Sequence, residues 1–167
     1  MTSNQRAYLA GLLDGDGSIM LQLKPREGMR YLFRVKTAVV LYQDSRYMET
    51  LKKFRTLIGA GYVYRRNDHM SELRIEGFTQ VKRFLQLIQP YVQFKHNQVT
   101  LLLAALNIAQ RKKYTIDEFL EICKMADAIA TTNYRSSQRK YTAAYVRQIL
   151  EDHNLVPVTT GSPTVSE

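Results

Sequence analysis

The N-terminal part of the chain changes from helical to strand spacing of its apolar positions. Residues 4–15 carry two stripes at helical spacing, and Ser3 can cap this helix. The larger stripe comprises Tyr8, Leu9, Leu12 and Leu13, and the stripe of small residues comprises Ala7, Ala10, Gly11 and Asp14. Apolar residues then recur at every second position over 19–24 and 33–42, with a turn between the two segments. The pattern predicts a helix followed by a β-hairpin.

The same order of elements recurs in the next part of the chain. Residues 45–58 carry apolar side chains at helical spacing. Alternating segments over 62–66 and 72–76 predict a second hairpin. Thr79 can cap a third helix, which a proline at position 90 ends.

Helical spacing continues from Lys95 towards the C-terminus. A capping box over 115–118 opens one helix, and a last short helix covers 142–152. We expect one domain over 1–156, followed by a disordered tail over 157–167. The order helix, strand, strand, helix, strand, strand, helix is typical of an α+β fold with an antiparallel sheet. Helices cover one face of such a sheet, and the other face is free.

Composition narrows the class of partner. The 167 residues are 45% apolar, which suits a globular protein with a sizeable core. A formal net charge of +9 makes an extended polyanion the natural partner. The single Cys123 excludes an intrachain disulfide and a cysteine zinc cluster. Because the first 20 residues do not resemble a signal peptide and no apolar run reaches the roughly 20 residues of a membrane span, we expect a soluble, intracellular protein and no membrane partner.

The free face of the predicted sheet is rich in basic and amide side chains. Its outward positions, with the adjoining turn, are Gln22, Lys24, Arg26, Arg30, Arg34, Lys36, Tyr42, Tyr64, Arg66, Glu72 and Arg74. A β-sheet can lie in the DNA major groove, where Arg and Lys pair with guanine and Gln pairs with adenine. An ordinary solvated sheet face has a similar composition, so the pattern alone leaves both interpretations open.

A second basic segment lies near the C-terminus. Residues 131–150 include Arg135, Arg139, Lys140 and Arg147 and no acidic residue. Phosphate contacts would suit these side chains and would add affinity rather than sequence choice. A basic surface helix is the alternative.

Two aspartates end the first predicted helix. Asp14 and Asp16 stand where the helix dipole is negative, and each carboxylate there is unfavourable by about 0.3 to 1 kcal/mol. A divalent cation would compensate this charge, and oxygen ligands suit Mg²⁺. A plain Asp-Gly turn is the competing interpretation. The spacing excludes an EF-hand and a dinucleotide-binding fingerprint, because Ile19, Met20 and Pro25 occupy positions that those motifs reserve for other residues.

Residues 9–17, LAGLLDGDG, closely resemble the motif that names the LAGLIDADG homing endonucleases. The resemblance extends over most of residues 7–150. Its further matches are KP at 24–25, Gln43, GAGYV at 59–63 and QPYVQFK at 89–95. These matches look like the single-motif, homodimeric branch of the family, which is usually encoded in group I introns.

The resemblance implies an αββαββα core with an antiparallel DNA-binding sheet and C-terminal helices. It also implies that the motif helices of two copies pack side by side. The residues implied at this interface are Ala7, Ala10, Gly11 and Asp14. One motif per chain therefore implies a homodimer. The resemblance further implies where the protein is located. We expect an organelle, a chloroplast or mitochondrion, if the host is eukaryotic, and the cytoplasm otherwise.

The resemblance also implies a set of active-site residues. Asp16 and the carbonyl of Gly15 would hold metal ions between the two copies, whereas Asp14 would be structural. Gln43 matches the residue that positions water, and Lys95 matches the charged residue near the scissile phosphate. One position departs from the family, because Tyr47 stands where close relatives carry a basic residue. Arg46, one position earlier, is the candidate to replace it.

These matches predict a site-specific endonuclease that makes a double-strand break in a long, pseudo-palindromic DNA target by metal-dependent phosphodiester hydrolysis. The resemblance implies Mg²⁺ as cofactor, with Mn²⁺ as a substitute and Ca²⁺ binding without cleavage. The outward positions of the sheet would contact base edges. The alternatives are a maturase, which binds intron RNA and assists splicing, and a DNA-binding regulator that has lost the chemistry. Intact Asp16, Gln43 and Lys95 argue against lost chemistry.

Overall fold

A four-stranded antiparallel sheet with the order β1-β2-β4-β3 organises the fold. The computed structural model describes residues 1–132 and 140–157. The strands are β1 (Gly17–Pro25), β2 (Phe33–Asp44), β3 (Tyr62–Arg65) and β4 (Met70–Glu76). Both hairpins are antiparallel, and β2 joins them by pairing with β4. The α+β class predicted from the sequence is thus confirmed.

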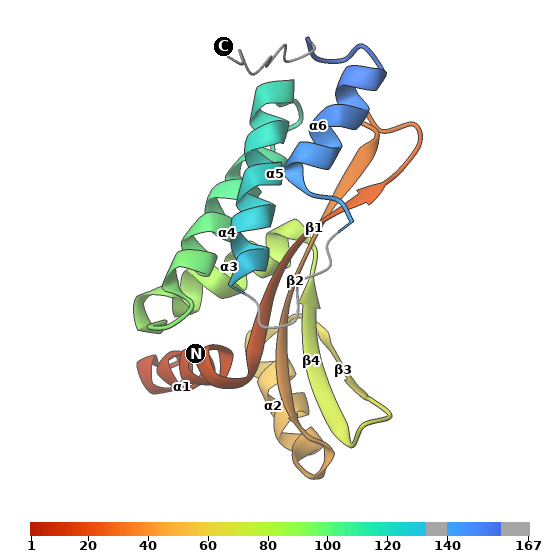
Figure 1. Ribbon diagram of the computed structural model, residues 1–167. Helices are drawn as coiled ribbons and strands as arrows, with labels where there is room; N and C mark the ends of the chain where they lie inside the picture. The colour runs from red at the N-terminus through yellow and green to blue at the C-terminus, as the bar shows by residue number, and fades with distance from the viewer. Residues whose placement is uncertain (133–139, 158–167) are drawn as a thin grey trace, which may run out of the picture.

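Six α-helices and two short 3-10 turns complete the described residues. They are α1 (Ser3–Asp16), α2 (Met48–Ile58), α3 (Phe78–Ile88), α4 (His96–Ala109), α5 (Ile116–Thr131) and α6 (Ala143–Asp152), with η1 (Ser45–Tyr47) and η2 (Gln89–Tyr91). In Figure 1, α4 and α5 run side by side along one side of the β1–β2 hairpin, and α6 lies near the tip of that hairpin. None of the helices in the described ranges has the length and apolar character needed to cross a membrane.

Three helix starts differ from the prediction, and the second helix, predicted over 45–58, begins at Met48 after the 3-10 turn η1. Thr2, rather than Ser3, caps α1, because its hydroxyl accepts the N–H of Gln5 while the Gln5 side chain accepts the N–H of Thr2. Gly77, rather than Thr79, precedes α3, and its positive φ of 86° is one that a glycine adopts without strain. The capping box that opens α5 at Thr115 is confirmed.

The apolar side chains at alternating strand positions form the core between the sheet and the helices. Ile19, Leu21 and Leu23 of β1 are buried, and the intervening Gln22 and Lys24 are exposed, as predicted. The outer face of β2 is less open than predicted, because Ala38 and Val40 are also buried there. Their cross-strand neighbours include Met20, Arg74 and Glu76, whose longer side chains flank them.

The chain passes from α1 into β1 without a loop. Asp16 is the last residue of α1, and Gly17 is the first residue of β1. A Cβ atom at Gly17 would lie 2.6–2.7 Å from atoms of Leu13, so only glycine fits this close turn. The sheet thereby fixes the direction in which the aspartate-bearing end of α1 points.

Candidate active site and DNA-binding face

Asp16 presents an open carboxylate at the C-terminal end of α1. Its side chain is exposed, and it makes no hydrogen bond or ion pair with any residue in 1–132 or 140–157. Gly15 is exposed as well, and its carbonyl belongs to the last turn of the helix, where carbonyls lack helical partners. The carboxylate and carbonyl oxygens are both of the kind that Mg²⁺ prefers.

Asp14 is bound within its own chain. Its Oδ2 accepts the N–H of Gln93 at 2.7 Å, and its Oδ1 accepts the N–H of Lys95 at 2.9 Å. Lys95 is the residue that precedes α4, so the carboxylate lies at the positive end of that helix dipole. The charge of Asp14 is therefore stabilised by backbone donors and needs no cation, in contrast to the expectation that a metal compensates both aspartates.

Lys95 lies beside both aspartates. Its Nζ donates a hydrogen bond to the backbone carbonyl of Asp14. Partial burial lowers the pKa of Lys95 below its usual value, and the nearby carboxylates of Asp14 and Asp16 oppose this shift. The structure thus brings together Asp16 and Lys95, two of the residues predicted for the active site.

Gln43 lies near the end of β2, at the same end of the sheet as the junction of α1 with β1. The register places Leu41 opposite Gly17, and Gln43 lies two residues further along the strand. Its Oε1 accepts the N–H of Asp44 at 3.0 Å. The side-chain amide nitrogen has no hydrogen-bond partner among the described residues, so it is available as a donor.

Arg46 is held in a two-point ion pair with Asp44. Its Nε and Nη2 each lie 3.0 Å from a different carboxylate oxygen of Asp44. The hydrogen bonds from Arg46 lower the pKa of Asp44. The Arg46 side chain is 80% exposed, and neighbouring Tyr47 is 54% exposed. Before the Arg46 guanidinium could bind a phosphate at two points, the phosphate would have to displace Asp44.

A shallow pocket of about 460 Å³ next to η1 is lined by two basic residues that sequence reasoning missed. Arg65 and His69 line it together with Asp44, Ser45 and Arg46. Strand alternation predicts that the Arg65 side chain points away from the outer face, and His69 belongs to no recognisable motif in the sequence. The β3–β4 turn brings both side chains next to η1, a juxtaposition that no local pattern signals.

The exposed stripe of α1 keeps Ala7 and Gly11 of the predicted stripe, gains Gly15, and lacks Ala10 and the half-buried Asp14. Ala7, Gly11 and Gly15 are exposed, and a Cβ atom at either glycine would meet nothing within 4 Å. Ala10, which we predicted at an interface between two copies, is instead 0% exposed and packs into the core of its own chain. Ala10 therefore has no surface to offer a second copy.

The outer face of the sheet carries most of the predicted DNA-contacting residues. The exposed ones are Gln22, Lys24, Arg26, Arg34, Lys36 and Tyr64, and Tyr42, Arg66 and Arg74 are half-buried. Glu72 also lies on this face, but it is only 2% exposed and pairs with Arg66 and Arg74. The expectation that Glu72 is an open side chain is therefore wrong. Lys140 is exposed, and Arg135 and Arg139 lie outside the described residues.

Few metal-ligating side chains lie near one another in the part of the chain that the structure describes. No group of three His, Cys, Asp or Glu side chains gathers anywhere in residues 1–132 and 140–157. Asp16 and the Gly15 carbonyl offer two oxygen-donor groups, and Mg²⁺ usually completes its coordination with water and substrate oxygens. A second copy of α1 would double the donor groups.

Comparison with known proteins assigns the chain to a family. Residues 9–101 match the model of the LAGLIDADG endonuclease family. The DNA endonuclease I-CreI of Chlamydomonas reinhardtii is 33% identical over 144 residues, which are 86% of this chain and 87% of that protein. The DNA endonuclease I-CvuI of Chlorella vulgaris is 30% identical over 147 residues, which are 87% of this chain and 89% of that protein.

Solved structures share the fold. I-CvuI, in complex with the I-CreI target and Mg, superimposes with a TM-score of 0.83 and 28% identity, over 92% of this chain and 96% of that one. The archaeal intron-encoded homing endonuclease I-Vdi141I, complexed with DNA, has a TM-score of 0.80 at 16% identity, over 92% and 98% of the two chains, and so supports the fold alone. The family match, the two relatives and the shared fold show that this chain belongs to the LAGLIDADG family of site-specific DNA endonucleases.

Proposed function

We propose that this endonuclease acts as a homodimer that cuts both strands of a pseudo-palindromic DNA target with Mg²⁺. The observation that carries the proposal is the exposed Asp16, which has no side-chain partner among the described residues and lies at the end of a helix whose exposed stripe is made of small residues. Two such helices can approach closely along Ala7, Gly11 and Gly15, because nothing larger than a methyl group projects there. Their ends would then bring two Asp16 carboxylates together.

Exposed aromatic side chains near this stripe support the dimer. Phe94 is 89% exposed and stands between Gln93 and Lys95, the two residues that bind Asp14 at the end of α1. Tyr8 is 61% exposed on α1 itself. Apolar side chains of this size beside a small-residue stripe are better accommodated in an interface than in water.

The oxygen donors at this end of α1 fit a hard divalent cation. Asp16 and the Gly15 carbonyl would hold it, with the matching pair from the second copy. When bound, Mg²⁺ supplies the positive charge that phosphodiester hydrolysis requires at the attacked phosphate and the leaving oxygen. We expect Mn²⁺ to replace it and Ca²⁺ to support binding without cleavage.

The remaining residues act on the phosphate and its water. Lys95, fixed through its backbone by Asp14, places an ammonium group near Asp16, where it offsets the charge that develops on the phosphate. Gln43 holds its carbonyl oxygen on the Asp44 N–H and keeps its amide donors free to orient a water molecule. Arg46 has the lesser role, because Asp44 already neutralises it.

The outer face of the sheet would contact the DNA. The structures of I-CvuI hold DNA targets, and the present chain shares that fold. Exposed Gln22, Lys24 and Arg34 on β1 and β2 are of the types that bind base edges and phosphates. A dimer would present this surface twice, related by a two-fold axis, so its target would be an inverted repeat.

A cleavage selection tests the proposal. The protein is incubated with randomised duplex DNA and Mg²⁺, and the cut ends are sequenced. We expect one inverted-repeat consensus, no cutting after chelation of the metal, and no cutting by Asp16→Asn. Cutting by Asp16→Asn at the wild-type rate would remove Asp16 from the mechanism. Tight binding of intron RNA by a protein that cuts no DNA would instead favour the maturase alternative.

A further inference from the structure

Glu72 is a buried carboxylate on the open face of the sheet. Its side chain is 3% exposed, whereas the side chains of the neighbouring Arg66 and Arg74 are 37% and 23% exposed. Tyr42 of β2 and Tyr64 of β3 are its direct cross-strand neighbours and cover it from both sides. The pKa of Tyr64 is raised above its usual value, chiefly because of its hydrogen bond with Glu72.

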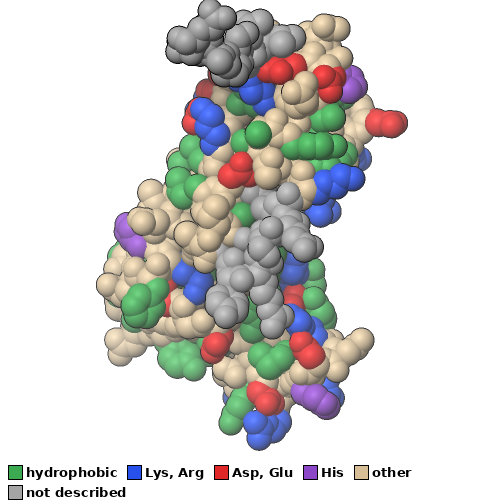
Figure 2. Space-filling model, viewed as in Figure 1, with side chains coloured by type: hydrophobic (Ala, Val, Ile, Leu, Met, Phe, Trp, Pro, Cys, Tyr) green, Lys and Arg blue, Asp and Glu red, His purple; other side chains and the backbone are tan. Residues whose placement is uncertain are grey.

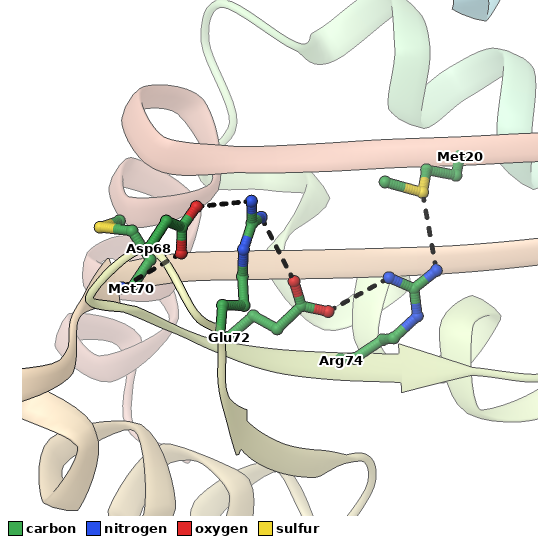
Figure 3. A network of polar contacts seen from close by, with 6 residues as sticks. Met20, Asp68, Met70, Glu72 and Arg74 are labelled. Atoms are coloured by element: carbon green, nitrogen blue, oxygen red, sulfur yellow. Dashed lines mark hydrogen bonds and ion pairs between the residues drawn. The ribbon is translucent and has the colours of Figure 1, made fainter.

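Arg66 and Arg74, the two arginines on the outer face at the β3–β4 hairpin, both pair with Glu72. Arg74 Nη1 lies 3.2 Å from Oε1 of Glu72, and Arg66 Nη1 lies 3.7 Å from Oε2. Each carboxylate oxygen thus faces a different guanidinium, as Figure 3 shows. A carboxylate buried to this degree requires such partners, because burial of an unpaired charge is strongly unfavourable.

Each arginine is also held at a second point. Arg66 Nη2 binds Asp68 at 2.7 Å, and the guanidinium stacks over the Tyr42 ring with its carbon 5.6 Å from the ring centre. Arg74 Nε binds Glu76 at 2.8 Å, and its Nη2 lies 3.9 Å from the sulfur of Met20 on β1. Asp68 and Glu76 are about half exposed, with side-chain exposures of 51% and 50%, so their pairs are screened by water. Glu72 is the buried member that both arginines share.

The other half of the face is built differently. Lys24, Arg34 and Lys36 on β1 and β2 are exposed and form no ion pair with any residue that the structure describes. Around Glu72, two arginines stand among three carboxylates. The lower part of Figure 2, over the β3–β4 hairpin, accordingly shows acidic and basic side chains mixed. Free cations suit phosphates, whereas a guanidinium held in one pose suits the paired acceptors of a guanine edge.

We propose that Glu72 is a positioning residue for sequence recognition. It fixes Arg66 and Arg74 so that the β3–β4 half of the face discriminates base pairs, while the β1–β2 half supplies most of the unpaired positive charge. The inference rests on the proposed function, in which this face contacts DNA. It replaces the expectation that Glu72 itself touches a base.

The test compares Glu72→Gln with Glu76→Gln and Asp68→Asn. All three variants remove one negative charge from the same cluster, so they change the overall electrostatic attraction to DNA by the same amount. The readout is the base preference at each target position, from sequencing of DNA cut by each protein from a randomised library. A bidentate arginine contact discriminates bases by about 1–3 kcal/mol, which is roughly 5- to 150-fold.

We expect Glu72→Gln to lose about 10-fold or more of the preference at one block of neighbouring base pairs in each half-site, and to leave the other positions unchanged. The two control variants should keep every preference within about two-fold, as surface pairs contribute little. A profile for Glu72→Gln that matches the controls would overturn the proposal. If Glu72→Gln does not fold, Glu72→Asp, which keeps the charge but shortens its reach, must weaken the same block, and an unchanged profile overturns the proposal equally. If the wild type neither binds nor cuts DNA, the proposed function fails and this inference fails with it.

Discussion

The carboxylate of Asp14 accepts the backbone N–H of Lys95 at 2.9 Å, although the two residues are 81 positions apart in the sequence. The Lys95 ammonium group donates in return to the backbone carbonyl of Asp14. This reciprocal contact fastens the end of α1 to the start of α4. Because Asp16 ends α1 and Lys95 precedes α4, the contact also sets the spacing between the carboxylate that we propose binds the metal and the cation that we propose faces the phosphate.

Substitution of Asp14 tests this role. An amide at position 14 retains one acceptor, so Asp14→Asn loses one of the two hydrogen bonds that the carboxylate receives from Gln93 and Lys95. A hydrogen bond to a charged group contributes about 1.5–3 kcal/mol, and we expect the free energy of unfolding to fall by about that amount. Urea denaturation measures the loss, and single-turnover cleavage should slow because Lys95 shifts. An unchanged free energy of unfolding would show that the contact does not stabilise the fold.

Asp16→Asn should have the opposite effect on stability. The Asp16 carboxylate is exposed, unpaired among the described residues and located at the negative end of α1. Its removal should leave the free energy of unfolding unchanged or raise it by about 0.3–1 kcal/mol. Cleavage should nevertheless disappear, while DNA binding persists. A variant that loses as much stability as Asp14→Asn would show that Asp16 is structural.

The sequence predicted the order of the elements because each has its own periodicity. The alternation in β1 and the helical spacing in α5 are local signals, and the structure confirms both. The resemblance at 9–17 likewise pointed to a family that the comparisons confirm. Local patterns did not reveal how much of each face neighbouring residues cover. Ala10 and Ala7 are equally small, and only the packing of α1 buries Ala10.

Long-range pairing explains the other differences. Strand alternation correctly placed Glu72 on the outer face. Its burial, however, depends on Arg66 and Arg74 and on two tyrosines, one from β2 and one from β3. The partners of Asp14 lie beyond two α-helices, two short 3-10 turns and four strands along the chain. Arg65 and His69 meet Arg46 only because η1 follows β2 at the sheet end where β3 turns into β4. Such contacts depend on tertiary structure, and no pattern of residue spacing in the sequence indicates them.

Gly11→Leu tests the proposed dimer interface. A Cβ at Gly11 meets nothing within 4 Å, so the larger side chain should not disturb the fold of one chain. In a dimer that brings two α1 helices together through this stripe, it should separate the backbones and weaken association by 10-fold or more, which corresponds to about 1.4 kcal/mol. Sedimentation equilibrium measures the association, and Gln86→Leu, at an exposed position of α3, is the matched control. Equal association of the two variants would place the interface elsewhere.

The pH dependence of stability should include a contribution from Glu76. Its pKa is lowered from the usual value of 4.5, first of all by its hydrogen bond with Arg74. Since the folded-state pKa is below the unfolded one, the stabilisation is complete above about pH 4.5 and is lost as the pH falls through the folded value. Urea midpoints of the wild type and Glu76→Gln, measured at pH 7 and then downwards from pH 5, should therefore differ most at pH 7 and converge in acid. The difference should be small, because half of the Glu76 side chain is exposed to water. If the difference between the two urea midpoints instead grew as the pH fell, it would contradict the lowered pKa of Glu76 and with it the pairing of Glu76 with Arg74.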